Sequence, residues 1–212
     1  MKTLIKLLLI LLLLAGGGYY WLSNEQALPD WYLEGEAVET VLPAEEAAER
    51  VEEVQEQLRT EQKVEIAESD ISTMLREKIN TQFGEQSDEL IKGLRSSIKP
   101  DKVALEMVID AEKIPWDDLP KSYEYAKPFI AQLSALSDGN LFVSASGRPR
   151  LNEEGRLTFD DQAIVQLGLF EYSLKDAVDM LESSGQRQIL DMLSNLPFRD
   201  ITLGNGVMVF ER

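Results

Sequence analysis

The chain has 212 residues with 38 acidic and 21 basic side chains, a net charge of −17, and it contains neither Cys nor His. This composition excludes disulfides, thiolate nucleophiles, Ser-His-Asp relays, haem ligated by His and ordinary zinc sites, so we expect no enzyme and no cofactor. Because an acidic surface repels phosphates, we also expect no nucleic-acid partner.

Residues 1–23 form a hydrophobic leader. Lys2 and Lys6 are its only charges, and residues 7–22 are all apolar, Gly or aromatic. This is the pattern that export machinery recognises. Counted from Thr3, with Lys6 reaching toward the headgroups, 20 residues suffice to cross a hydrocarbon core of ~30 Å. Lys on the leading side predicts a cytoplasmic N-terminus and an extracytoplasmic remainder.

A cleaved signal peptide is the alternative. Residues 15–17 (Ala-Gly-Gly) offer small side chains for cleavage before Gly18. The cluster Tyr19-Tyr20-Trp21 directly after the glycines suits an aromatic belt at the membrane interface and favours an uncleaved signal-anchor. We therefore expect a single-pass protein of the bacterial cell membrane, with its domain in the cell envelope, periplasmic or extracellular.

Residues 24–61 are expected to form an acidic stalk and an amphipathic helix. Residues 24–42 are polar and lead to Pro43, which suits the first turn of a helix over 44–61. The apolar stripe of that helix is narrow and rich in Ala, and acidic residues cover the other face. The stripe consists of Ala44, Ala47, Ala48, Val51, Val54 and Leu58. It could pack on the domain or on a partner helix.

A strand and a helix follow. Alternation over 63–67 predicts a short strand. Ser69 is the expected N-cap of the next helix, with Asp70 in its first turn and Gly84 as its C-cap.

Two long strands are expected over 91–98 and 103–114, joined by a turn at 99–102. A helix over 123–136 then ends at 137–140, and a hairpin spans 141–169.

Ser173 is expected to cap a helix, and a second helix carries Ile189 to Leu196. The chain finishes as a hairpin around Gly204-Asn205-Gly206. Helices mixed with antiparallel hairpins indicate an α+β fold, with residues 62–212 as one domain.

The layout over 62–212 is similar to that of the YpmS-type membrane-anchored bacterial proteins and, more distantly, to the tubular lipid-binding (TULIP-like) architecture. The points of likeness are the helix segment 71–75 (Ile-Ser-Thr-Met-Leu), the strand 103–114, the hairpin 141–169, the turn Leu167-Gly168-Leu169 and the closing hairpin. The resemblance implies a long curved antiparallel sheet packed on several helices, with an apolar groove for an acyl chain. It implies no catalytic residues.

The alternating strands and the covering helix supply candidates for such a groove. They are Leu105, Met107, Ile109, Phe129, Leu133, Leu141, Val143, Phe159 and Ile164. Alternation places residues on an inner face without saying whether that face is filled, so each of them could instead be an ordinary core residue.

Three polar motifs each have a functional and a structural interpretation. Trp116-Asp117-Asp118 offers an aromatic platform and paired carboxylates, but flanking prolines favour a turn and an N-cap. Residues 153–154 and 160–161 could supply oxygen ligands for Ca²⁺, yet no calcium-binding loop is present and solvated hairpin charges are favoured, so we expect no metal. Residues 147–150 (Gly-Arg-Pro-Arg) could grip a phosphate headgroup or protect an edge strand.

Three functions remain open. The first is a membrane-anchored, non-enzymatic domain that binds a lipid or amphiphile in an apolar groove. The second is a scaffold subunit of a cell-envelope complex that docks an envelope protein through the helix at 44–61. The third is a hydrolase that uses Asp117 or Asp118, for which no substrate is indicated.

Overall fold

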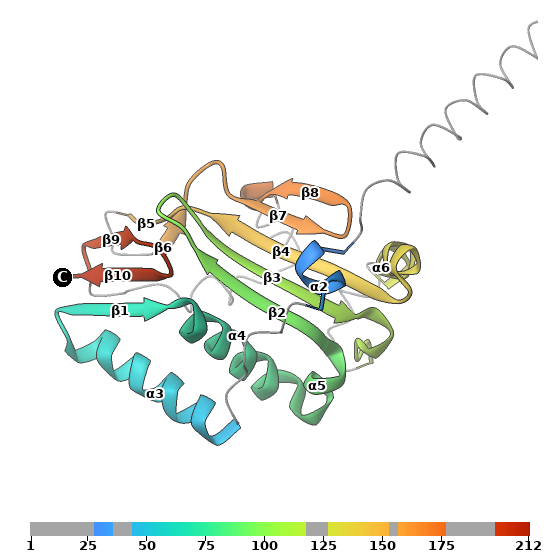
Figure 1. Cartoon of the computed structure of the whole chain (residues 1–212), viewed down its shortest axis with the longest axis horizontal. Coiled ribbons are helices and arrows are strands. Elements are labelled where there is room, and N and C mark those ends of the chain that lie inside the picture. The colour runs from blue at the N-terminus through green and yellow to red at the C-terminus, as the bar shows by residue number, and fades with distance from the viewer. Residues whose placement is uncertain (1–27, 36–43, 118–126, 153–156, 177–197) are drawn as a thin grey trace, which may run out of the picture.

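The computed structural model describes residues 28–35, 44–117, 127–152, 157–176 and 198–212 (Figure 1). The fold is α+β, as predicted, and its largest element is a five-stranded antiparallel sheet in the order β2-β3-β4-β7-β8. These strands are β2 (Ile91–Ile98), β3 (Val103–Asp110), β4 (Asn140–Gly147), β7 (Ile164–Leu167) and β8 (Phe170–Ser173).

A three-stranded sheet lies beside the end of β2. It has the order β1-β10-β9, with β1 (Lys63–Ala67), β9 (Asp200–Leu203) and β10 (Val207–Glu211). The predicted strand over 63–67 and the predicted closing hairpin are both confirmed. The N–H of Gly206, whose φ is +79°, donates to the carbonyl of Ile98 at 2.9 Å and so links the two sheets.

Two helices cover the three-stranded sheet. α3 (Ala44–Thr60) confirms the predicted amphipathic helix and packs along α4 (Glu68–Phe83) (Figure 1). Val54 of α3 is fully buried in a core with Val64, Ile66 and Phe210. The apolar stripe of α3 therefore packs on its own domain.

The expected N-cap at Ser69 is wrong. α4 begins at Glu68 with Ala67 as its N-cap, because the Asp70 carboxylate accepts the Ala67 N–H at 3.0 Å. The predicted end of the helix is confirmed at Gly84, whose φ of +62° suits glycine. Short helices η1 (Gly84–Gln86) and α5 (Ser87–Leu90) lead into β2.

The expected strand end at Ile114 is also wrong. β3 stops at Asp110, whose carboxylate accepts the Glu112 N–H at 3.1 Å and so starts the short helix η2 (Ala111–Lys113). Of the predicted helix over 123–136, the structure describes α6 (Lys127–Ser134) and η4 (Ala135–Ser137), and residues 123–126 lie outside the described ranges. The left-handed residue Asp138 (φ 51°) follows η4.

The expected hairpin over 141–169 is more complex than the sequence suggests. β4 pairs with β7, while β5 (Pro149–Leu151) and β6 (Leu157–Phe159) form a separate two-stranded sheet. A further strand, β8, lies between the predicted turn Leu167-Gly168-Leu169 and the predicted helix, where no strand was expected. The Ser173 hydroxyl does accept the Asp176 N–H at 3.0 Å, as expected of an N-cap, but both helices expected beyond it lie largely or wholly in the undescribed range 177–197.

Part of the expected stalk packs on the domain. The short helix α2 (Asp30–Leu33) lies over β3 and β4, and its Trp31, 7% exposed, contacts Val108 and Phe142 (Figure 1). A Cβ on Gly93 would come within 2.9 Å of the Trp31 ring, so only glycine admits the indole here.

Candidate functional site: the apolar face of the large sheet

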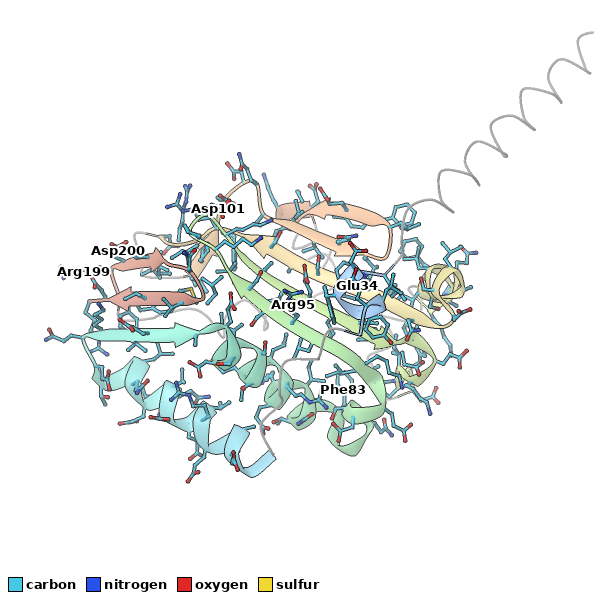
Figure 2. All side chains as sticks on the ribbon, in the orientation of Figure 1. Glu34, Phe83, Arg95, Asp101, Arg199 and Asp200 are labelled. Atoms are coloured by element: carbon cyan, nitrogen blue, oxygen red, sulfur yellow. The ribbon has the colours of Figure 1, made fainter. Side chains whose placement is uncertain are left out.

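The two faces of the five-stranded sheet differ in polarity. Directly paired residues point to the same side, so the register defines rows that cross all five strands. One row on the α2 side is polar throughout, and it consists of Arg95, Glu106, Ser144, Gln166 and Glu171. Figure 2 shows Arg95 on the side of the sheet from which the molecule is viewed.

The opposite side, named here the apolar face, is almost entirely hydrocarbon. Its two central rows are Leu94, Met107, Val143, Leu167 and Phe170, and Ser96, Leu105, Ala145, Val165 and Tyr172. β-Branched, aliphatic and aromatic side chains thus fill neighbouring positions on four consecutive strands, from β3 to β8.

Helices cover the two flanks of the apolar face. At β2, α4 packs over the sheet, and the hydroxyl of Ser96, which is buried, donates to the Glu68 carbonyl at 2.6 Å. At the start of β4, Leu133 of α6 packs on Leu141 and Ala111 to form a second core cluster. Among the described residues, α4 therefore covers the face at β2, and α6 covers it at the start of β4.

The middle of the apolar face is only half-covered. Leu105, Met107, Ala145 and Val165 are each partly exposed, and none belongs to a buried cluster among the described residues. We name these four residues the central strip. It is apolar surface that the domain's described core does not use.

The structure brings most of the predicted groove residues together. Leu105, Met107, Ile109, Leu141 and Val143 share the apolar face, as the alternation predicted. Leu133 faces them from α6, and Phe129 lies on the same helix with its ring 5.8 Å from that of Phe170.

Two predicted groove residues lie elsewhere. Ile164 pairs with Ser146 and so points to the polar side of the sheet. Phe159 belongs to the separate β5–β6 sheet and is 39% exposed. Both predictions failed because the chain turns at 160–163 between β6 and β7, and this turn breaks a segment that the sequence suggested was continuous.

Sequence reasoning missed the contribution of β7 and β8 to the apolar face. Val165, Leu167 and Tyr172 lie there beside Ala145. The alternation of Val165 and Leu167 about Gln166 is a usable signal, but only once the turn at 160–163 separates it from β6.

An open hollow surrounds Trp116. This open depression of about 630 Å³ is lined by Gln86, Glu89, Glu112, Lys113, Ile114, Pro115, Trp116, Asp117 and Lys127. Lys113 binds Glu89 at 2.8 Å, and this contact lowers the pKa of Glu89 and raises that of Lys113. A general acid needs a raised carboxyl pKa, so Glu89 does not fit that role, and Asp118 lies outside the described residues.

Another hollow, of about 540 Å³, includes both arginines of the 147–150 motif. Three basic residues line it, Lys102, Arg148 and Arg150, alongside three acidic ones, Asp101, Asp160 and Asp161. The charges balance, so no net positive field remains to attract a phosphate. Within the described ranges no cluster of acidic side chains could hold a metal ion, and residues 153–154 lie outside them.

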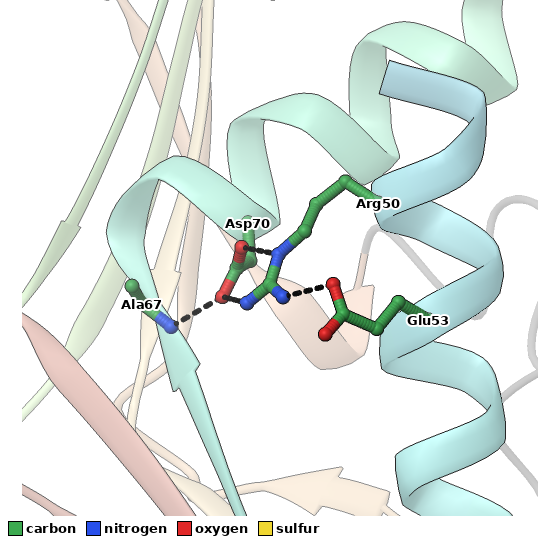
Figure 3. Close-up of polar contacts among 4 residues, drawn as sticks. All are labelled: Arg50, Glu53, Ala67 and Asp70. Carbon is green, nitrogen blue, oxygen red and sulfur yellow. Dashed lines mark hydrogen bonds and ion pairs between the residues drawn. The ribbon is translucent and has the colours of Figure 1, made fainter. Parts of the chain in front are cut away.

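A polar cluster joins α3 to α4 (Figure 3). The Arg50 guanidinium donates to both carboxylate oxygens of Asp70, at 2.7 and 3.1 Å, and to Glu53 at 2.6 Å. Burial tends to raise the pKa of Asp70, but its hydrogen bonds with Arg50 and the Ala67 N–H outweigh this and lower it. Every group in the cluster has a partner within the fold, so its role is structural.

Comparison of the chain with family models, with curated proteins and with solved structures finds no match. The likeness to YpmS-type and tubular lipid-binding proteins therefore stays a prediction. None of the helices in the described part of the chain is long and apolar enough to cross a membrane, and the hydrophobic leader lies outside that part.

Proposed function

We propose that this protein is a membrane-anchored, non-enzymatic extracytoplasmic domain that binds the acyl chain of a lipid or amphiphile on its apolar face. The observation that carries the proposal is the central strip, where Leu105, Met107, Ala145 and Val165 stay partly exposed between α4 at β2 and α6 at the start of β4. The leader, with its positive start and long apolar run, supports the proposal, because a signal-anchor would hold such a domain beside a source of lipid.

The chemistry of the strip favours a hydrocarbon ligand. From β3 to β8 the apolar face spans three strand spacings, about 14 Å, without a charged side chain in its two central rows. Covering this surface with an acyl chain gains about 25 cal/mol for each Å² of apolar area removed from water. The resemblance to the TULIP-like architecture implies the same class of ligand, held in an apolar groove.

Binding fits this chain better than conversion does. The chain lacks His and Cys, and the carboxylate of Glu89 in the Trp116 hollow is engaged by Lys113. The hydrolase hypothesis would require Asp117→Asn or Asp118→Asn to abolish an activity, and no described cluster suggests a substrate for it.

Photo-cross-linking tests the proposal in the membrane. The full chain in phosphatidylcholine vesicles is incubated with a diazirine fatty acid, irradiated and mapped by mass spectrometry. Cross-links should concentrate on β3, β4 and β7, and Ala145→Phe should remove them by filling the strip. Ser144→Phe is the matched control, because Ser144 is the neighbouring residue on the polar face. Equal labelling of both variants would refute the site.

The scaffold alternative retains one supporting observation. The acidic side chains of α3 stay exposed on the face opposite its buried stripe, and they are Glu46, Glu49, Glu52, Glu53 and Glu56. Docking would then depend on charge and not on the apolar stripe. Glu49→Lys with Glu52→Lys and Glu56→Lys should abolish capture of an envelope partner, while leaving the Arg50–Glu53 contact in place.

A further inference from the structure

Exposed large apolar side chains gather at one end of the five-stranded sheet. Of the five in the described ranges, four lie at this end: Leu33 (53% exposed), Phe129 (38%), Leu136 (57%) and Phe170 (43%). The fifth, Phe159, lies beyond the opposite end of β4, near Gly147. We name the group of four the apolar rim.

Strand pairing and turn hydrogen bonds place the apolar rim at the end of the sheet where β4 begins. Leu136 belongs to η4, which leads into the start of β4, and Phe170 opens β8 directly after the turn from β7. The Gly168 N–H in that turn donates to the carbonyl of Phe142 at 2.7 Å, so the turn lies beside the same end of β4. α2, which carries Leu33, packs on Phe142 through Trp31 (Figure 1). Three separate parts of the chain thus present apolar side chains together, unlike the scattered exposure usual on protein surfaces.

The leader joins the domain at this end. Leu28 packs against the cluster of Trp31, Val108 and Phe142, and only residues 24–27 separate it from the hydrophobic leader. Four residues span at most about 14 Å even when fully extended. If the leader crosses a bilayer, the rim is the part of the described domain closest to the membrane surface.

We propose that the domain rests on the bilayer through the apolar rim, with Phe129, Leu136, Phe170 and Leu33 in the headgroup region. Aromatic and aliphatic side chains partition into that layer, and the short tether keeps them at high local concentration beside it. Because the domain is strongly acidic, the favoured partner is a zwitterionic surface such as phosphatidylcholine and not an anionic one.

The rim is continuous with the apolar face. Phe170 ends the row that runs through Leu167 and Val143 to Met107, and Phe129 contacts it from α6. An acyl chain leaving the outer leaflet would therefore meet the central strip without crossing water. This inference rests on the proposed function, from which it takes the membrane anchor and the lipid ligand. It adds the surface through which the ligand reaches the central strip.

Fluorescent labelling tests the contact, and the absence of native Cys makes single-site labels unambiguous. Leu136→Cys and Leu33→Cys, in the full chain in phosphatidylcholine vesicles, carry the environment-sensitive NBD fluorophore. Asp200→Cys, exposed in the three-stranded sheet at the far side of the molecule (Figure 2), is the control label. Labels on the rim should emit at shorter wavelength than in water, and brominated lipid should quench their fluorescence. The control label should show neither effect. Equal quenching at all three positions, or none at any, would overturn the proposal.

Matched substitutions separate the rim from general hydrophobicity. Phe129→Glu with Phe170→Glu should abolish the quenching at Leu136→Cys, while Phe159→Glu, at a Phe of similar exposure outside the rim, should leave it unchanged. If both changes act alike, the rim is not the contact.

The outcomes also separate this inference from the proposed function. If the rim labels are quenched but Ala145→Phe leaves fatty-acid cross-linking unchanged, the membrane contact is upheld and the binding strip is refuted. Cross-linking on the strip with unquenched rim labels would refute the contact and leave the strip. A chain that fails to float with vesicles would refute both.

Discussion

The apolar side chains of the two antiparallel sheets are buried to different extents. In the three-stranded sheet, Val64 and Ile66 alternate with polar residues, and their side chains are buried with Phe210 beneath α3 and α4. In the five-stranded sheet, Leu105 and Met107 also flank a polar residue, Glu106, but they stay partly exposed. Alternation therefore identifies the apolar face of a strand, but it does not tell what covers that face.

The difference follows from chain order. β1 lies directly between α3 and α4, so the two helices that cover it are its neighbours in sequence. The strands β3, β4 and β7 lie side by side in the large sheet. On their apolar face the described helices are α4, which packs at β2, and α6, which packs at the start of β4. The central strip is left between them.

The largest expected effect tests the closed sheet. Phe210→Ala removes a ring that is 3% exposed and lies 5.4 Å from that of Phe198. The free energy of unfolding should fall by about 3–5 kcal/mol, because a cavity forms in a filled core. Urea denaturation of the full chain in nanodiscs measures this. A loss below about 1 kcal/mol would mean that this core is not closed.

The next effect concerns the ion pair that holds α3 over the closed sheet. Asp70→Asn should cost about 2 kcal/mol, between the values for exposed and buried pairs, since Asp70 is buried and Arg50 half-buried. Glu53→Gln, at an exposed partner of the same Arg50, should cost at most about 0.5 kcal/mol. Equal losses for the two variants would contradict the structural role of Asp70.

The same pair predicts a pH dependence. Because the native pKa of Asp70 lies below its ordinary value of about 3.9, the stabilisation is complete above that value. It is lost as the pH falls through the lowered native pKa. The difference in free energy of unfolding between the wild-type chain and Asp70→Asn should therefore shrink below about pH 4, as measured by urea denaturation across that range.

Local patterns in the sequence predicted the parts of the fold that depend on neighbouring residues. The strand 63–67, the turn at 99–102 and the hairpin around Gly204-Asn205-Gly206 all have the predicted bounds to within a residue or so. Two other predicted boundaries were wrong because an Asp side chain bonds to a nearby backbone N–H. Asp70 moved the start of α4 to Glu68, and Asp110 ended β3 four residues early.

The candidate site depended on information that is not local. Leu105, Met107 and Val143 could be assigned to one face from their own strands, but the partners Val165 and Tyr172 required knowledge of how β7 and β8 pair. Trp31 was likewise missed. Its segment scatters apolar residues among acidic ones, and only Gly93, more than 60 residues later, makes room for its ring.

A smaller effect is expected where the large sheet is closed on its polar side. Gly93→Ala places a methyl group 2.9 Å from the Trp31 ring, and the overlap should cost about 1–2 kcal/mol or displace α2. Displacement would shift the Trp31 fluorescence to longer wavelength. Ser97→Ala, on the same strand and the same face, is the control and should change neither quantity. An unaltered spectrum and stability in Gly93→Ala would mean that α2 does not pack there.

The smallest effect is expected on the central strip, and it decides between the two kinds of sheet. Met107→Ala should lower the free energy of unfolding by about 1 kcal/mol or less, because a half-exposed side chain leaves water-accessible surface and not a sealed cavity. Fatty-acid cross-linking should fall in the same variant, since the ligand loses its contact with the Met107 side chain, which lies beside Leu105 and Val143 on the apolar face. A loss of stability as large as that of Phe210→Ala, with cross-linking unchanged, would mean that the strip is closed core and that the two sheets do not differ.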